Sequence, residues 1–226
     1  MKYNITGSNL QIANIELDAG EELVTTGGAM VYTTGNVAME TKMEGGFMSG
    51  LKRSVSGAGM FLVKFKPQGG TGIVGIGGSA PGKIIELDIS KKVWICQRSS
   101  FLASEKDVKI DIAFQKKLGS ALFGGEGFVL QKLSGNGMAF AHACGDLVQY
   151  DLKPGEMVKV STSHVVAWED GVTYDISSVG GVKNILFSGE GLFVTTLTGP
   201  GRVILQSMTL YDLAMALSPF LPSSNS

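Results

Sequence analysis

The sequence has few of the side chains on which catalytic and metal sites usually depend. Only two histidines and two cysteines occur among its 226 residues. The cysteines, Cys96 and Cys144, lack the CxxC spacing of structural zinc sites, and their small number argues against a disulfide framework. We therefore expect both to be reduced thiols in the protein core.

The sequence also lacks long apolar runs and an excess of charge of either sign. No window approaches the roughly 18 consecutive apolar residues that a membrane-spanning helix needs. Lys and Arg number 19 and Asp and Glu number 20, so the net charge of -1 creates no overall field toward nucleic acid or an anionic membrane. No cationic segment followed by an apolar stretch opens the chain, so we expect no leader peptide and a cytoplasmic location.

Charged residues make up only 17% of the sequence, whereas hydrophobic residues make up 44%. This composition is typical of a folded chain with a real core rather than of a disordered one. It also indicates that some apolar surface is shared with another subunit.

Glycine is abundant, with 32 residues, and its positions repeat three times along the chain at intervals of about 65 residues. Each repeat opens with a similar turn, continues through a pair of glycines and closes with a second pair that precedes an apolar run. The opening turns are at 17–21, 87–91 and 152–156, the first pairs at 57/59, 125/127 and 189/191, and the closing pairs at 70/72, 135/137 and 199/201.

Between the glycines, apolar residues alternate with polar ones. Phe61, Val63 and Phe65 share one face of a predicted strand, and Val158 and Val160 share a face of another. Short alternating runs bounded by glycine turns are typical of all-β sandwiches and barrels. We predict a single domain of three repeats, about 1–80, 81–145 and 146–208, around a pseudo-threefold axis.

The pattern changes to helical spacing after Gln206. Leu210, Leu213 and Leu217 recur on one helix face, and Thr209 stands three residues before Asp212 as in a capping box. This predicts a short helix over 209–218. We expect its apolar stripe to cover the barrel as a lid, with a subunit or membrane contact as the alternative.

Two motifs resemble catalytic signatures but are better explained as turns. The sequence GTGIVG at 70–75 matches a dinucleotide fingerprint, but it leads into a strand rather than a helix, and the other two repeats have glycines at the same place. Glu126 and Glu190 occupy matching positions, but each lies between glycines. We assign no catalytic residue and no cofactor.

His142, Cys144 and His164 are the candidate metal ligands. His142 and Cys144 are two residues apart on a predicted strand and so share a face, and the fold could bring His164 near them. Core or surface positions without a metal explain the three residues better, because barrel metalloproteins present more histidines than this chain has.

A basic cluster precedes the first glycine pair in each repeat. A pseudo-threefold axis would gather these side chains into a ring that could hold an anion, acidic lipid headgroups or a nucleic-acid backbone. Solvated surface charge is the competing interpretation. The candidate residues are Lys52, Arg53, Lys116, Lys117 and Lys183.

Several short motifs in order resemble the altered inheritance of mitochondria (mitochondrial biogenesis) family and its prokaryotic branch. They are GGAMV at 27–31, MET at 39–41, LKR at 51–53, PG at 81–82, FLAS at 101–104, GEGF at 125–128, HVVA at 164–167, FSGEGL at 187–192, GPG at 199–201 and LQ at 205–206. The resemblance implies a double-stranded β-helix of three repeats, with a fold like that of the tryptophan RNA-binding attenuator protein. The resemblance implies no enzymatic activity. It does imply a role in assembly or in partnership with a membrane.

Together these features predict a cytoplasmic, non-enzymatic protein that works by binding or self-assembly as a homo-oligomer, with a membrane or protein partner. Nucleic acid is not the expected partner, because the net charge opposes it. Two alternatives stay open at this point. One is a metal-dependent, cupin-like barrel enzyme that acts on a small molecule, and the other is an anion or nucleic-acid binder that uses the basic ring.

Overall fold

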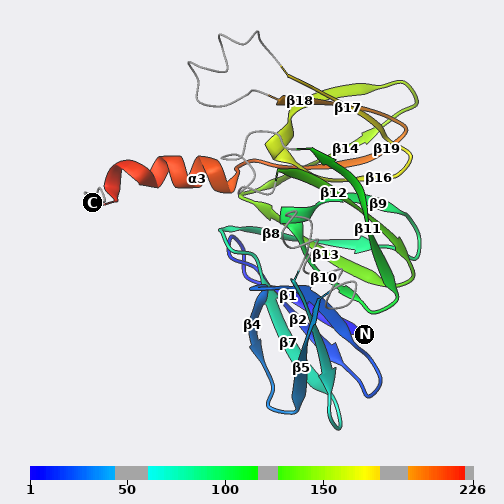
Figure 1. The fold of residues 1–226 in the computed structure, drawn as a ribbon, viewed down its shortest axis with the longest axis vertical. Coiled ribbons are helices and arrows are strands. Elements are labelled where there is room, and N and C mark those ends of the chain that lie inside the picture. Colours follow the sequence, from blue (N-terminus) through cyan, green and yellow to red (C-terminus); the bar gives the residue numbers. More distant parts are fainter. Residues whose placement is uncertain (44–60, 117–126, 179–192, 222–226) are drawn as a thin grey trace.

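The computed structural model describes residues 1–43, 61–116, 127–178 and 193–221, which form antiparallel strands, one α-helix and three short 3-10 helices. The strands make four sheets, A to D, stacked along the long axis of the molecule (Figure 1). The prediction of an all-β fold with a short C-terminal helix is confirmed.

The two end sheets are the smaller ones. In spatial order, sheet A consists of β1 (Lys2–Thr6), β2 (Ile12–Leu17), β7 (Gly72–Gly77) and β4 (Met30–Thr33). Sheet D consists of β15 (Met157–Ser161), β18 (Phe193–Thr198) and β17 (Thr173–Ser178).

The two central sheets have six strands each. Sheet B consists, in spatial order, of β5 (Val37–Met43), β6 (Phe61–Pro67), β3 (Leu23–Thr26), β10 (Phe101–Glu105), β13 (Met138–Cys144) and β8 (Gly82–Asp88). Sheet C consists of β11 (Val108–Lys116), β12 (Phe128–Gly135), β9 (Trp94–Gln97), β16 (Val165–Glu169), β19 (Gly201–Gln206) and β14 (Leu147–Leu152).

Three hydrophobic cores fill the spaces between successive sheets. Residues such as Phe65 and Phe140 lie in the core between sheets A and B, and Leu133 lies in the core between sheets B and C. Trp168 lies in the core between sheets C and D. Central sheets therefore bury apolar residues on both faces, which is why β9 and β10 are nearly continuous apolar runs.

The predicted alternation is present, and both faces of β6 contribute to cores. Val63 and Phe65 pack in the core between sheets A and B, whereas Leu62 packs in the core between sheets B and C. In β15, Val160 is buried and Lys159 is exposed. Leu62, on the other face of β6, is buried as well because sheet B is covered on both sides.

The strand order recurs in the three predicted repeats. Strands β2-β7-β4, β8-β13-β10 and β14-β19-β16 form matching triplets, one in each of the ranges 1–80, 81–145 and 146–208. Within the described residues, strand pairing joins the first repeat to the second in sheet B and the second to the third in sheet C, but no strand of the third repeat pairs with one of the first. Strand pairing in one chain thus supplies no closure around a pseudo-threefold axis, and the axis stays a prediction.

The closing glycines of the repeats lie in or directly beside the turns that precede β7, β13 and β19, as the sequence predicts. Gly70, Gly135 and Gly201 have φ angles of 63°, 107° and 142°, a region that other residues adopt only at a cost. Most of the first glycine pairs lie outside the described residues, as do Glu126 and Glu190.

Helix α3 (Leu210–Leu217) begins at the predicted capping box. The Asp212 backbone N–H donates to Thr209 Oγ1 at 3.0 Å, and the Thr209 backbone N–H donates to Asp212 Oδ2 at 3.0 Å. The expectation of a lid is wrong, because α3 has no buried residue and projects from the side of the stack (Figure 1). The facing sheets themselves cover the three cores, so the helix is not needed to bury them.

Candidate functional site

His142 is a packing residue at the junction of two repeats. It lies on β13 opposite Ile84, and its ring rests against Gly78 and Gly82, where a β-carbon would collide with it. Burial lowers the pKa of His142, and a hydrogen bond with the Ala80 backbone opposes that shift in part. The neutral imidazole is thus the form that the fold favours.

This arrangement predicts a pH dependence of stability that originates at His142. Because the folded-state pKa lies below the ordinary value of 6.5, protonation favours the unfolded chain. The free energy of unfolding should be at its plateau above that value and should fall as the pH drops from it toward the folded-state pKa. Urea denaturation of wild type and of His142→Gln at several pH values between 7.5 and 5 would measure this. A fall of equal slope in both proteins would contradict the assignment.

Cys144 and His164 lie near Asp212, at the base of α3. His164 Nε2 is 3.7 Å from Asp212 Oδ2, and burial together with the Asp212 charge raises the pKa of Cys144. Asp212 also caps α3, and Gln206 binds the backbones of Cys144 and Ser163. These contacts give the group a structural role at the start of the helix.

The three candidate metal ligands do not form a metal site together. His142 packs against Gly78 and Gly82, and His164 lies in a 3-10 helix, η2 (Thr162–His164), near Asp212. In the described part of the chain, no group of three or more His, Cys, Asp and Glu side chains is placed to hold a metal ion.

The cysteines are free and buried, as predicted. Cys96 lies on β9 in the core between sheets B and C, and burial raises its pKa to about 12. A thiol with that pKa stays protonated at neutral pH and is a poor nucleophile. Most of the predicted basic ring, Lys52, Arg53, Lys117 and Lys183, lies outside the described residues, as does the side chain of Lys116.

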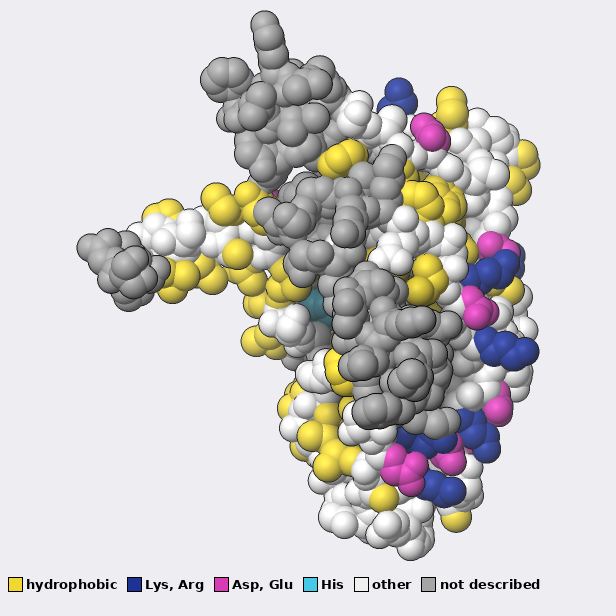
Figure 2. All heavy atoms as spheres, viewed as in Figure 1, with side chains coloured by type: hydrophobic (Ala, Val, Ile, Leu, Met, Phe, Trp, Pro, Cys, Tyr) yellow, Lys and Arg dark blue, Asp and Glu magenta, His cyan; other side chains and the backbone are white. Residues whose placement is uncertain are grey.

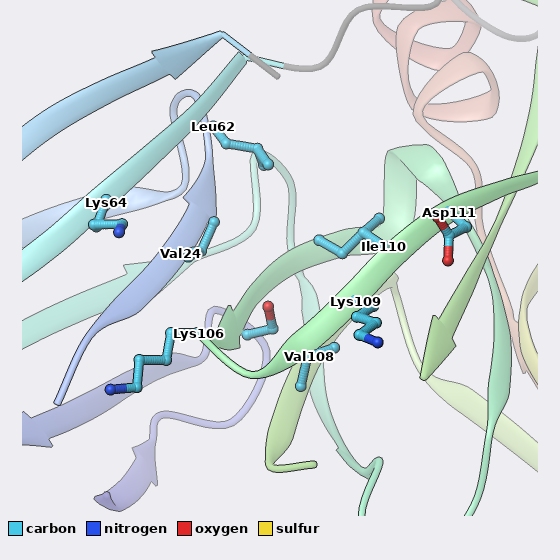
Figure 3. Close-up of a pocket in the computed structure, with 9 residues that line it drawn as sticks. Val24, Leu62, Lys64, Lys106, Val108, Lys109, Ile110 and Asp111 are labelled. Carbon is cyan, nitrogen blue, oxygen red and sulfur yellow. The ribbon is translucent and has the colours of Figure 1, made fainter. Parts of the chain in front are cut away.

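A pocket of about 370 Å³ lies where strands of the first two repeats meet. Figure 3 shows Val24 and Leu62 on one side of this space and Val108 and Ile110 on the other. No sequence pattern points to this pocket, because its walls come from β3, β6, β10 and β11, which are far apart in the chain.

Lysines and a buried hydroxyl add polarity to the pocket. Lys64 forms an ion pair with Glu22 at 2.7 Å, which lowers the pKa of Glu22 and raises that of Lys64. Lys106 and Lys109 also line the pocket, and the buried Ser104 Oγ has no hydrogen-bond partner among the described residues. Asp111 lines the pocket too, so the lining suits a small molecule with an apolar body and polar groups of either sign.

Among the described residues, two of the strand edges that lack a partner lie in the end sheets, at opposite ends of the stack. Strand β4 is at the edge of sheet A and β15 is at the edge of sheet D, and in the described residues neither has a strand partner on its outer side. Met30, Val31 and Tyr32 of β4 and Met157 of β15 are exposed. Figure 2 shows apolar side chains over the region of β4 and along α3, whereas charged side chains gather on the opposite side of the molecule.

Helix α3 is a second apolar surface. Leu210, Met215 and Leu217 are exposed, and so are Phe220 and Leu221 just beyond it. Asp212, at its N-terminal end, is its only charged residue. Among the described residues, no helix is both long and apolar enough to cross a bilayer.

Comparison with known proteins places the chain in a family. Residues 3–208 match the model of a family described as "Mitochondrial biogenesis AIM24". An uncharacterised protein of Streptococcus pyogenes serotype M6 is 30% identical over 234 residues, which cover 100% of this chain and 93% of that protein. A crystal structure of a Streptococcus pyogenes protein superimposes with a TM-score of 0.81 at 26% identity, over 97% of this chain and 99% of the other. The sequence resemblance is thereby confirmed, and the chain belongs to the mitochondrial biogenesis AIM24 family.

Proposed function

We propose that this protein is a non-enzymatic, cytoplasmic binding and self-assembly protein that acts as a scaffold. The observation that carries the proposal is the pair of strand edges without a partner in the described residues, β4 with its exposed apolar side chains and β15 with the exposed Met157, at the two ends of the stack. Unpaired edges of this kind present rows of backbone donors and acceptors to another chain, and most proteins block them with charge, proline or covering segments. Strand β4, with the sequence MVYT, has neither charge nor proline.

The candidate chemical groups support binding rather than catalysis. His142 packs against glycines, and His164 and Asp212 support the base of α3. The high pKa of Cys96 speaks against a nucleophilic role. Free, buried thiols fit a reducing compartment, and this supports the cytoplasmic part of the proposal.

Helix α3 supports a further contact with a protein partner. Its exposed side chains are apolar, and it has no basic residue with which to bind anionic lipid headgroups. A protein surface is therefore a better match for the helix than an acidic membrane.

Self-association should be visible as a mass that depends on concentration. We expect sedimentation of the full chain at increasing concentration to give a weight-average mass above the monomer mass of 23.8 kDa. Association would bury apolar side chains of the edges and the helix, and this contribution is not screened by salt. Moderate salt should therefore not dissociate the assembly. A mass that stays at the monomer value over the whole concentration range would overturn the proposed function.

A further inference from the structure

Two junctions inside the chain show how neighbouring repeats are joined. In sheet B, β10 pairs antiparallel with β3, with Ala103 opposite Thr25. In sheet C, β16 pairs antiparallel with β9, with Ala167 opposite Cys96. Each junction lies in the middle of a six-stranded sheet and joins an edge of one repeat to an edge of the next.

Strand β4 occupies the same place in the strand order of its repeat as β10 and β16 do, but among the described residues it has no partner that would form a junction. Strands β10 and β16 pair on their other side with β13 and β19, with a shift in register just before Ala103 and Ala167. Strand β4 pairs with β7 with the same shift, just before Tyr32. The outer side of β4 therefore corresponds to the sides of β10 and β16 that form junctions.

Strand β15 is the matching counterpart of β3 and β9. It pairs with β18 just as β3 pairs with β6 and β9 pairs with β12. In each case the second strand of the pair also pairs with a third strand, which is β17, β5 or β11. Val160 lies two residues before η2, as Cys96 lies two residues before the 3-10 helix η1 (Arg98–Ser100). Val160 thus corresponds to the Cys96 side of the second junction.

The exposed side chains at the ends occupy positions that the internal junctions bury. Leu102 is 6% exposed and Val166 is 0% exposed, whereas Val31 at the corresponding place in β4 is 54% exposed. At the other end, Lys159 and Ser161 of β15 are exposed, whereas the matching residues Ile95 and Gln97 of β9 are buried. Both ends therefore expose positions that an internal junction buries, and at β4 the exposed side chains are apolar.

We propose, as a refinement that rests on the proposed function, that a second copy of this chain completes the missing junction. The outer edge of β4 in one copy pairs antiparallel with the outer edge of β15 in the next, which joins copies head to tail. Transfer of the internal registers gives the facing pairs Tyr32 and Val160, Thr33 and Lys159, and Thr34 and Val158.

The partner of each end is a second copy of this chain, because the β4 edge and the β15 edge are complementary rather than alike. Both internal junctions join an edge of the β4 type to an edge of the β15 type, and the described residues contain no pairing of two edges of one type. Sheet D of one copy and sheet A of the next would then merge in the order β17-β18-β15-β4-β7-β2-β1, and its first six strands follow the same kind of order as those of sheets B and C. Contacts of this heterologous kind have a direction along the assembly.

Cysteine cross-linking tests the register directly. Thr33→Cys and Lys159→Cys are made as separate proteins, mixed and oxidised; the native Cys96 and Cys144 are buried and should not compete. Facing residues in an antiparallel pair are close enough for a disulfide, whereas residues displaced by two are not. We expect a disulfide-linked dimer in the mixture and none in either variant alone. The double variant Thr33→Cys/Lys159→Cys should give a ladder of larger species.

An off-register mixture is the matched control. Thr33→Cys with Met157→Cys places the second thiol on the same strand and face, two residues away, and should give at least about tenfold less dimer. Equal yields from the two mixtures, or dimers of Thr33→Cys alone, would overturn the proposed junction.

A second measurement uses charge at the edge. Val31→Lys places a charge at the position that the internal junctions bury, and should weaken self-association by about tenfold or more. Met39→Lys on β5 is the control, because Met39 is 56% exposed and lies outside the proposed junction. If wild type and Val31→Lys associate equally while wild type exceeds the monomer mass, the junction is wrong and the proposed function stands. A monomeric wild type would refute both.

Discussion

Replacement of Trp168 by alanine is expected to lower the free energy of unfolding by about 3–5 kcal/mol. Trp168 is fully buried on β16 and packs in the core between sheets C and D, with its ring centroid 5.2 Å from that of Tyr174. Its removal would leave a cavity in this core. Strand β16 is held by β9 and β19 on its two sides, so it cannot move to fill the cavity. Urea denaturation followed by circular dichroism would measure the loss.

Trp168→Phe is the control for this prediction. The Trp168 Nε1 donor is buried and has no hydrogen-bond partner in the described structure, so phenylalanine removes an unsatisfied group along with some volume. We expect the phenylalanine variant to lose less than about half of what the alanine variant loses. Equal losses in the two variants would show that packing at this site is not the source of the stability.

Gly135→Ala is expected to lower the free energy of unfolding by about 2–4 kcal/mol. Two costs act together at this turn. The φ angle of 107° is one that a residue with a β-carbon rarely adopts, and that β-carbon would collide with the backbone carbonyl oxygen of Asp107. The turn links β12 to β13, so relief of the collision would disturb the ends of sheets B and C.

Gly155→Ala separates the two costs. Gly155 has a φ angle of 78°, but a β-carbon there would meet nothing within 4 Å. We expect its replacement to cost only about 1–2 kcal/mol, from the backbone alone. A loss at Gly135 no greater than that at Gly155 would contradict the role assigned to the Asp107 contact.

Local features were predictable because short spacings determine them. The capping box at Thr209 and Asp212 needs only three residues, and it is present as predicted. Alternation in β15 and the turn at Gly135 likewise depend on neighbouring residues. The candidate site was less accessible, since the side chains chosen for their chemistry, His142 and His164, proved to have packing and capping contacts.

The position of α3 shows where local information ends. Its apolar spacing correctly predicted a helix, but the same spacing suits a lid, a subunit contact or a membrane contact. Whether an apolar face is covered depends on whether other sheets have already closed the core, and here they have. The pocket beside Val24 and Ile110 had no sequence signal for a related reason, because its walls belong to two different repeats.

The sequence by itself determined the fold class, the turns, the helix cap and the family, because these depend on residue spacing and on motifs in order. Only the tertiary structure decided which strands lack a partner. β4 and β10 are both short apolar strands, yet one is exposed and the other is buried. The difference lies in a pairing partner many residues away, and backbone hydrogen bonds of that kind leave no local pattern in the chain.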